Sequence, residues 1–313
     1  MNEATSIRTK AALATDFDII GAREAYLKAF RSRDADALGA LFAPAAIRVN
    51  PGTPDAIGRT EIRDVMARHF ETFGNQSIAD TYRFIQDRCM IAVWTWHATQ
   101  DADYLGVPAS GKQVGVMGAS VFWFGEDGKI IKECTYWDPY GVLKQLGAGA
   151  EPGREIPPHA TAPEIFVAGR TDAEAANIRH LRTYHSYLLG GQLQPWLDYM
   201  TDDIAWDDQM APGLAVGKKH SASDFAMLRS AFGDPEIKSV NVWGNNQFVI
   251  HQGIFTARHK GELMGIPASN RFVIVDNIDV ISFTPDGKID KGWSFGNSIE
   301  MGYQLGVGAK QAQ

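Results

Sequence analysis

Apolar residues recur along the chain first with the spacing of a helix and then with the alternation of strands. Over residues 19–33 they fall at Ile20, Leu27 and Phe30, after an aspartate that can cap a helix. Two further helical patterns cover 35–42 and 60–73. These periodicities predict three helices at the start of the first half.

Four β-rich runs follow the helices. They span residues 77–85, 89–100, 113–124 and 130–136, and a brief strand is expected near 47–49. Turn residues such as Asp87-Arg88 and Glu126-Asp127-Gly128 join them as antiparallel neighbours. Helices followed by hairpin-linked strands predict an α+β domain, a curved antiparallel sheet with helices on one face.

The second half repeats the first with a constant offset. Residues 105–112 (LGVPASGK) return as 264–271 (MGIPASNR), an offset of 159, and the same offset carries 127–130 (DGKI) onto 286–289. Helices are accordingly expected near 173–190 and 217–231. Strands are expected near 236–243, 246–259, 271–283 and 288–296. A repeat this long indicates the duplication of a whole domain.

The domain boundaries follow from the repeat. We expect one domain at 17–148, a linker at 149–171 and a second domain at 172–308, because the joining stretch is rich in Gly, Pro and Ala. The linker is long enough for the copies to pack as an internal pseudo-dimer, with further homo-oligomers left open.

Composition narrows the class of protein. The 313-residue chain has a net charge of −7 and no basic run, which argues against a nucleic-acid partner. It contains no apolar run of roughly 20 residues, so we expect no membrane span. Residues 1–15 do not have the pattern of a signal peptide, and a cytoplasmic location is expected. Cys89 and Cys134 have no counterparts in the second half and are read as buried thiols.

A signature shared by the two halves resembles a known family. It consists of a Gly-x-Pro-Ala-Ser turn at 106–110, DGKI at 127–130, Trp137-Asp138 and QLG at 145–147. This pattern resembles the SnoaL-like polyketide cyclases, of the superfamily that includes nuclear transport factor 2 and ketosteroid isomerase. The resemblance implies two tandem cone-shaped NTF2-like domains.

The resemblance also implies a His/Asp pair, and each half has lost one member. The histidine position holds Gln100 in the first half and His259 in the second. The acid/base aspartate is Asp138 in the first half and Asn297 in the second.

Asp138 is the candidate catalytic residue, with two interpretations open. As a buried carboxylate it would exchange a proton with a carbon next to a carbonyl group. Because it precedes Pro139, it is equally suited to cap a helix that has proline at its first position.

The candidate substrate-binding residues are polar or aromatic side chains on the first helix and on the strands. They are Tyr26, Asn50, Trp94, Trp96, Gln100, Tyr104, Tyr136 and His259. The alternative is that the tryptophans are core residues, and that His259 lies at the rim of the pocket with its ring hydrogen-bonded to the backbone. His251 and His259 lie too far apart on one strand to share a metal ion, so no metal is expected.

These features lead to two hypotheses of function. The first is a cofactor-independent general acid/base enzyme of the lyase, isomerase or cyclase type, acting on a small hydrophobic carbonyl compound that is aromatic or polyketide-like. The second is a non-catalytic small-molecule binding protein of the same superfamily. The first half is richer in aromatic residues and is favoured as the working half.

Overall fold

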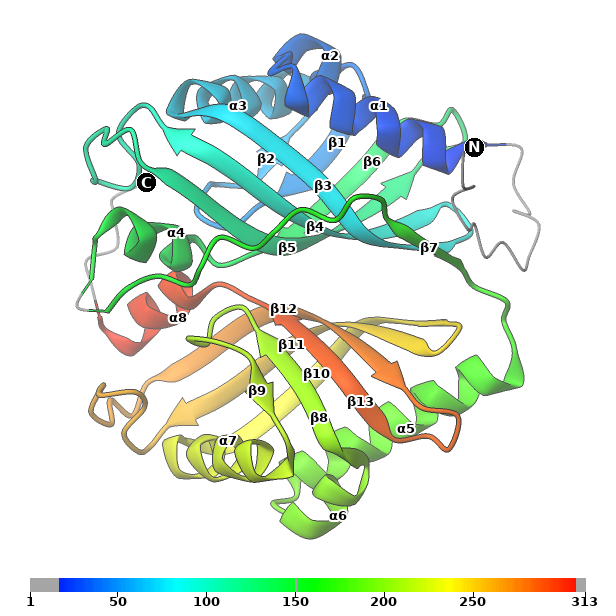
Figure 1. Cartoon of the computed structure of the whole chain (residues 1–313), viewed down its shortest axis with the longest axis vertical. Coiled ribbons are helices and arrows are strands. Elements are labelled where there is room, and N and C mark those ends of the chain that lie inside the picture. The colour runs from blue at the N-terminus through cyan, green and yellow to red at the C-terminus, as the bar shows by residue number, and fades with distance from the viewer. Residues whose placement is uncertain (1–16, 150, 308–313) are drawn as a thin grey trace. The chain divides into compact units, whose positions relative to one another are not determined.

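The chain folds into two compact units that repeat one architecture (Figure 1). The structure, a computed structural model, describes residues 17–149 and 151–307. One unit comprises the chain up to Trp137 together with Gly141–Gly169, and the other comprises Asp138–Tyr140 and the chain from Arg170. The expectation about residues 1–15 and the predicted domain end at 308 lie outside the described residues.

The first unit is a sheet covered on one face by helices. Its helices are α1 (Ile19–Arg31), α2 (Ala35–Gly39) and α3 (Arg59–Thr72), and α4 (Pro139–Leu146) follows the last long strand. The sheet order is β2-β1-β6-β5-β4-β3-β7. The strands are β1 (Phe42–Val49), β2 (Ala56–Ile57), β3 (Phe73–Gln86), β4 (Cys89–Gln100), β5 (Gln113–Phe124), β6 (Ile130–Tyr136) and β7 (Glu164–Val167).

The second unit has the same plan, with sheet order β10-β11-β12-β13-β8-β9. Its helices are α5 (Asp172–Leu189), α6 (Leu193–Asp198), α7 (Lys218–Ala231) and α8 (Ser298–Leu305). Its strands are β8 (Met200–Asp208), β9 (Ala215–Val216), β10 (Phe232–Asn245), β11 (Phe248–His259), β12 (Phe272–Phe283) and β13 (Ile289–Phe295). The predicted α+β fold with tandem NTF2-like domains is confirmed.

The two units correspond residue by residue. Each element from β2 to α4 reappears with the same bounds at the offset of 159, from β9 to α8. Strand register is kept as well, since Asp80 lies opposite Trp94 on β4 and Ser239 opposite Gly253 on β11. Any position in one unit can therefore be compared with its counterpart in the other.

The sheets are mixed rather than wholly antiparallel. β1 pairs with β6 in parallel, and β8 pairs with β13 in the same way. The hairpin turns along the sequence indicated only the pairing of consecutive strands. β1 and β6 are far apart in sequence, and such strands can meet in parallel because the intervening chain crosses back over the sheet.

The segment expected to be a linker contributes to the first unit. Glu164–Val167 form β7, which pairs in parallel with β3 and extends the sheet by one strand. His159 accepts or donates hydrogen bonds at both ring nitrogens, to Ser77 Oγ and to Thr95 Oγ1, each at 2.7 Å. This stretch is thus fixed to β3 and β4 by side-chain as well as backbone bonds.

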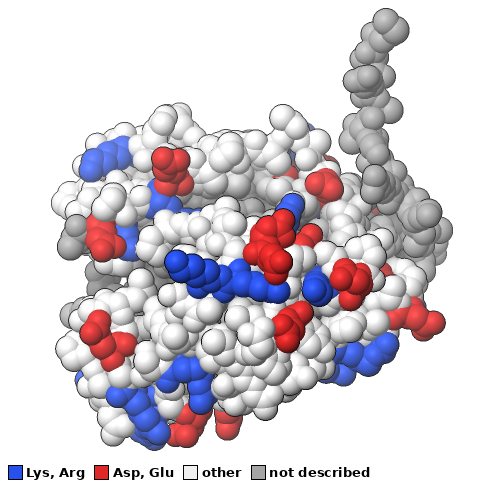
Figure 2. Space-filling model, turned by 60° about the horizontal axis from the view of Figure 1, so that its bottom comes forward, with Lys and Arg blue, Asp and Glu red and all other residues white. Residues whose placement is uncertain are grey.

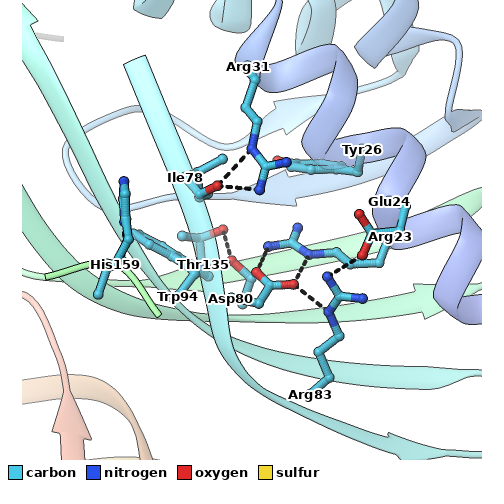
Figure 3. A network of polar contacts seen from close by, with 12 residues as sticks. Arg23, Glu24, Tyr26, Arg31, Ile78, Asp80, Arg83, Trp94, Thr135 and His159 are labelled. Atoms are coloured by element: carbon cyan, nitrogen blue, oxygen red, sulfur yellow. Dashed lines mark hydrogen bonds and ion pairs between the residues drawn. The ribbon is translucent and has the colours of Figure 1, made fainter. Parts of the chain in front are cut away.

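A buried charge cluster ties α1 to β3 in the first unit (Figure 3). Arg23 donates to both carboxylate oxygens of Asp80, at 3.0 and 2.7 Å, and Arg83 Nε donates to the same carboxylate at 2.7 Å. Arg83 also pairs with Glu24 at 2.6 Å. Burial alone would raise the pKa of Asp80, but the two guanidinium charges outweigh it and hold that pKa below its usual range.

The charged surface, the helices and the two cysteines can each be compared with what the composition predicted. Basic and acidic side chains lie next to one another on the face shown in Figure 2. None of the helices in the described ranges has the length and apolar character needed to cross a membrane. Cys89 and Cys134 are buried thiols, and burial raises the pKa of Cys89 to about 12.

Breaking the charge cluster should destabilise the first unit strongly. Asp80→Ala leaves two buried guanidinium groups without their shared carboxylate, which costs about 3–5 kcal/mol for a buried pair. Urea unfolding followed by tryptophan fluorescence measures the loss. The matched control is Asp202→Ala, which removes an exposed pair with Lys218 and should change unfolding little. Equal effects of the two substitutions would contradict this role of Asp80.

Candidate functional site

In the first unit, the helix-facing side of β4 is a continuous part of the core. Its alternate residues all belong to one hydrophobic cluster: Met90, Ala92, Trp94, Trp96 and Ala98. The indole N–H of Trp94 donates to Ser120 Oγ at 3.0 Å, and that of Trp96 donates to Gln76 Oε1 at 2.9 Å. Both tryptophans are packed and hydrogen-bonded within the protein, as in the core interpretation.

Tyr26 belongs to a buried polar cluster around Glu133. The Tyr26 hydroxyl and Thr135 Oγ1 donate to Glu133 Oε1 at 3.1 and 3.0 Å, and Arg48 Nε donates to Oε2 at 3.2 Å. Burial, then the nearby charge of Glu133, raises the pKa of Tyr26 well above its usual value. The hydroxyl therefore stays protonated and is engaged inside the first unit.

Four other predicted residues of the first unit also have internal contacts or face elsewhere. Asn50 accepts from the Trp137 indole at 3.2 Å. Gln100 is fully buried and donates to three backbone carbonyls, those of Ala102, Val107 and Pro108. The Tyr104 ring packs against Phe73, with ring centroids 5.0 Å apart. Tyr136 lies on the face of β6 opposite to Glu133, since side chains alternate along a strand.

Asp138 lies at the start of a helix. Its Oδ1 accepts from the backbone N–H of Tyr140 at 3.3 Å and from the N–H and hydroxyl of Ser298 at 3.1 and 2.6 Å. These partners belong to the same compact unit as Asp138. Bonds to N–H groups at a helix start are those of a capping residue. The catalytic role of Asp138 stays a prediction.

His259 is fully buried near the end of β11. Its Nδ1 lies 3.0 Å from Ser269 Oγ and accepts from the Ser269 N–H at 3.2 Å. Its Nε2 is buried and has no hydrogen-bond partner among the described residues. Because Nδ1 is an acceptor, Nε2 carries the proton, and this buried N–H has no acceptor among the described residues.

The second unit interrupts its core where the first unit continues. Along the helix-facing side of β11, Val249 belongs to one hydrophobic cluster and Ala257 to another. Between them lie His251 and Gly253, in the positions of Ala92 and Trp94. A histidine that is only 1% exposed thus replaces apolar packing in the middle of the strand.

The His251 ring occupies the space that a side chain at position 253 would need. A Cβ placed on Gly253 would lie 2.4 Å from His251 Cε1 and 3.1 Å from each ring nitrogen. Such distances are far inside van der Waals contact, so only glycine allows this ring position. The large residue Trp94 at the equivalent place in the first unit excludes such an imidazole.

Asp279 lies directly across from His251 on β12. Its Oδ2 is 3.5 Å from His251 Nδ1 and accepts from Asn277 Nδ2 at 3.0 Å. Its Oδ1 accepts from Ser294 Oγ at 2.7 Å, and that hydroxyl accepts from the Trp206 indole at 3.1 Å. The carboxylate is held from two sides beside the imidazole, with its side chain 12% exposed.

The other nitrogen of His251 points to a hydroxyl group. His251 Nε2 lies 3.0 Å from Ser239 Oγ on β10, and Ser239 is exposed. With Nδ1–H directed at Asp279, Nε2 carries the lone pair and accepts from the serine. Ser239, His251 and Asp279 therefore form a line across three adjacent strands, with a basic nitrogen next to an accessible hydroxyl.

His185 completes the group from α5. Its ring meets that of His251 edge-on, with centroids 4.8 Å apart. Burial, and then the neighbouring His251, lowers the pKa of His185 to about 4, although Asp279 acts in the opposite direction. His185 is consequently neutral at pH 7 and adds no positive charge beside His251.

Sequence reasoning missed His251, Asp279, Ser239, Ser294 and His185 as site residues, and considered His251 only in excluding a metal site. A signal was present in the repeat, since Asp279 and His251 replace Ser120 and Ala92 of the first half. His259, which was predicted, is eight residues from His251, or roughly 26 Å along the strand, so the structure does not bring them together.

Among the residues that the structure describes, no group of three or more His, Cys, Asp or Glu side chains is placed to hold a metal ion.

Comparison with known families decides the assignment. The family described as SnoaL-like domain matches residues 23–133, and the family described as SnoaL-like polyketide cyclase matches residues 178–305. The chain consists of two SnoaL-like domains in tandem. A search of curated proteins finds no match.

Solved structures similar to the chain each align with the length of one SnoaL-like domain. A SnoaL-like protein from Jannaschia sp. CCS1 is 19% identical, with 45% of this chain and 98% of that chain covered and a TM-score of 0.41. TsrD from Streptomyces laurentii is 24% identical, covering 42% and 96%, with a TM-score of 0.38. IdmH from Streptomyces antibioticus is 16% identical, covering 42% and 99%, with a TM-score of 0.37.

The lowered pKa of His185 makes a prediction for acid stability. The unfolded chain takes up this proton near the ordinary histidine pKa of 6.5, whereas the folded protein takes it up at about 4. The free energy of unfolding should therefore fall as pH is lowered from about 6.5 to 4. His185→Gln should flatten that slope in urea unfolding of the second unit.

The matched control is His220→Gln, at an exposed histidine on α7 that should leave the slope unchanged. An NMR titration of His185 with a midpoint near 6.5 would contradict the expectation.

Proposed function

We propose that this SnoaL-like tandem protein is a general acid/base enzyme of the cyclase or isomerase type, with its reaction centre in the second unit. The proposed substrate is a small carbonyl compound. The observation that carries the proposal is the His251–Asp279 pair, enclosed on the inner face of the sheet in space that Gly253 leaves free. Membership of the SnoaL-like family supports a reaction of this class.

In the proposed mechanism, His251 Nε2 removes a proton from a carbon next to the carbonyl group and returns it at another position. The Ser239 hydroxyl, which is exposed and bonded to Nε2, rotates aside to admit the substrate. Asp279 orients the ring through Nδ1–H and stabilises the imidazolium that forms. Ser294 and Asn277 keep the carboxylate in place.

The proposal moves the reaction centre away from the half that the sequence favoured. Aromatic residues are indeed more frequent in the first half, but Trp94 and Trp96 are packed there with their indole N–H groups bonded to protein side chains. The glutamate cluster of that unit is likewise bonded internally, with Glu133 only 1% exposed. In this proposal, the first unit is the structural half.

A binding protein without turnover is the second candidate. It is favoured because neither half keeps both members of the His/Asp pair that the family resemblance implies. Gln100 replaces the histidine in one half, and Asn297 replaces the aspartate in the other, where it caps α8 by accepting from the Glu300 N–H. A ligand that is bound by the wild type and shows no proton exchange after long incubation would support this candidate.

Removal of the His251 base should slow proton exchange strongly. The probe is methyl 4-oxo-4-phenylbutanoate in D₂O, with NMR measuring deuterium uptake next to the ketone. We expect the wild type to accelerate uptake over buffer, and His251→Ala to lower the rate about 10²–10⁴-fold. Asp279→Asn should lower the rate as well, because the ring loses its orienting carboxylate.

The control for this experiment is His220→Ala, which removes a surface histidine outside the proposed centre. Circular dichroism confirms that each variant is folded. Unchanged exchange in His251→Ala would refute the assignment of the base. Uptake in the wild type no faster than in buffer, across a panel of ketones, would count against the enzyme itself.

A further inference from the structure

The two units differ at one ion pair near the proposed centre. In the first unit, Arg23 on α1 binds the Asp80 carboxylate of β3 through two hydrogen bonds, at 3.0 and 2.7 Å, with both residues buried. The offset of 159 carries Arg23 onto Arg182 on α5 and Asp80 onto Ser239 on β10. The second unit has thus kept the arginine and lost the carboxylate.

The strand pairing at these positions is the same in both units. Asp80 and Ser239 lie opposite the equivalent residues Trp94 and Gly253, and the strand register shifts just after each of them. Arg182 precedes His185 by one helical turn, and His185 contacts His251. Arg182 therefore holds the repeat position of Arg23, one turn before the helix residue that contacts His251.

No described residue of the second unit takes the place of the missing carboxylate. Among the residues that the structure describes, none forms an ion pair or hydrogen bond with Arg182, and both Arg182 and Ser239 are exposed. The second arginine of the first-unit cluster, Arg83, is also replaced, by Val242. The guanidinium group at the repeat position of Arg23 is thus left without the carboxylate that the first unit supplies.

We infer that the second unit binds a carboxylate-bearing carbonyl compound, whose carboxylate takes the place that the Asp80 carboxylate has in the first unit. Arg182 holds this carboxylate by paired N–H donors, and the Ser239 hydroxyl, released from His251 Nε2, donates to it. The inference rests on the proposed function for its catalytic part, and it names the substrate class as keto acids.

The same geometry positions the reacting carbon. Ser239 Oγ is 3.0 Å from His251 Nε2, so a carboxylate at Ser239 brings the carbons next to it close to the basic nitrogen. His251 takes a proton from the carbon between the carboxylate arm and the ketone, which leaves an enolate and an imidazolium. Return of that proton restores the base, so the step is balanced without a co-reactant.

The test compares an acid with its neutral ester. The probes are 4-oxo-4-phenylbutanoate and its methyl ester, with affinities from titration calorimetry on the full chain. We expect the wild type to bind the acid about 10–100-fold more tightly than the ester, as a charge-assisted pair provides. Arg182→Gln should remove this preference by weakening binding of the acid. Arg179→Gln, at an exposed arginine on the same helix, is the matched control and should keep it.

A second variant rebuilds the pair of the first unit. Ser239→Asp places a carboxylate opposite Arg182, so it should abolish acid binding and raise the melting temperature of the second unit. Arg182→Lys should restore part of the preference that Arg182→Gln loses. These two variants give a clear result even where Arg182→Gln folds poorly.

Equal affinity for acid and ester, no binding of the acid, or an acid preference that survives Arg182→Gln would each overturn the inference. None of these outcomes bears on the general base. Deuterium uptake into the neutral ester still reports on His251, so failure of the anion site and failure of the proposed function are separable.

Discussion

The site in the second unit depends on one packing constraint, the absence of a side chain at Gly253. The imidazole of His251 lies where any side chain at position 253 would have to be, with 2.4 Å between the ring and the place of a Cβ. From that position, one ring nitrogen reaches Asp279 and the other reaches Ser239. Protein cores are close-packed, so a polar ring in the middle of a strand fits only where a neighbouring residue lacks a side chain.

The first unit solves the same packing problem in the opposite way. There the glycine is on the neighbouring strand, at Gly118, where a Cβ would lie 2.5 Å from the ring of Trp94. Trp94 fills the inner face and Ser120 satisfies its indole N–H. The exchange of large and small residues between adjacent strands turns an apolar core into a polar centre without altering strand register. After duplication, one copy can therefore change its chemistry while the other retains its stability.

The sequence was sufficient for the fold because local pattern and repeat agreed. The predicted strands 89–100 and 113–124 coincide with β4 and β5, and the offset predicted their counterparts β11 and β12. Parallel pairing of β1 with β6 and the strand β7 were not predictable, since they depend on contacts between segments distant in sequence. The partners of His251 were missed for the same reason, because cross-strand register decides that Asp279 lies opposite it. In the first half, the sequence identified polar and aromatic candidates but not their partners. Hydrogen bonds inside the protein engage Tyr26, Asn50 and Gln100.

The position of the ring proton on His251 is the most direct test of this account. Long-range ¹⁵N–¹H NMR on protein labelled at histidine distinguishes the two neutral tautomers at pH 7.5. The account predicts a proton on Nδ1, directed at Asp279, and an unprotonated Nε2 facing Ser239. A proton on Nε2 with a bare Nδ1 would contradict it, because the nitrogen that is to accept the substrate proton would already be occupied.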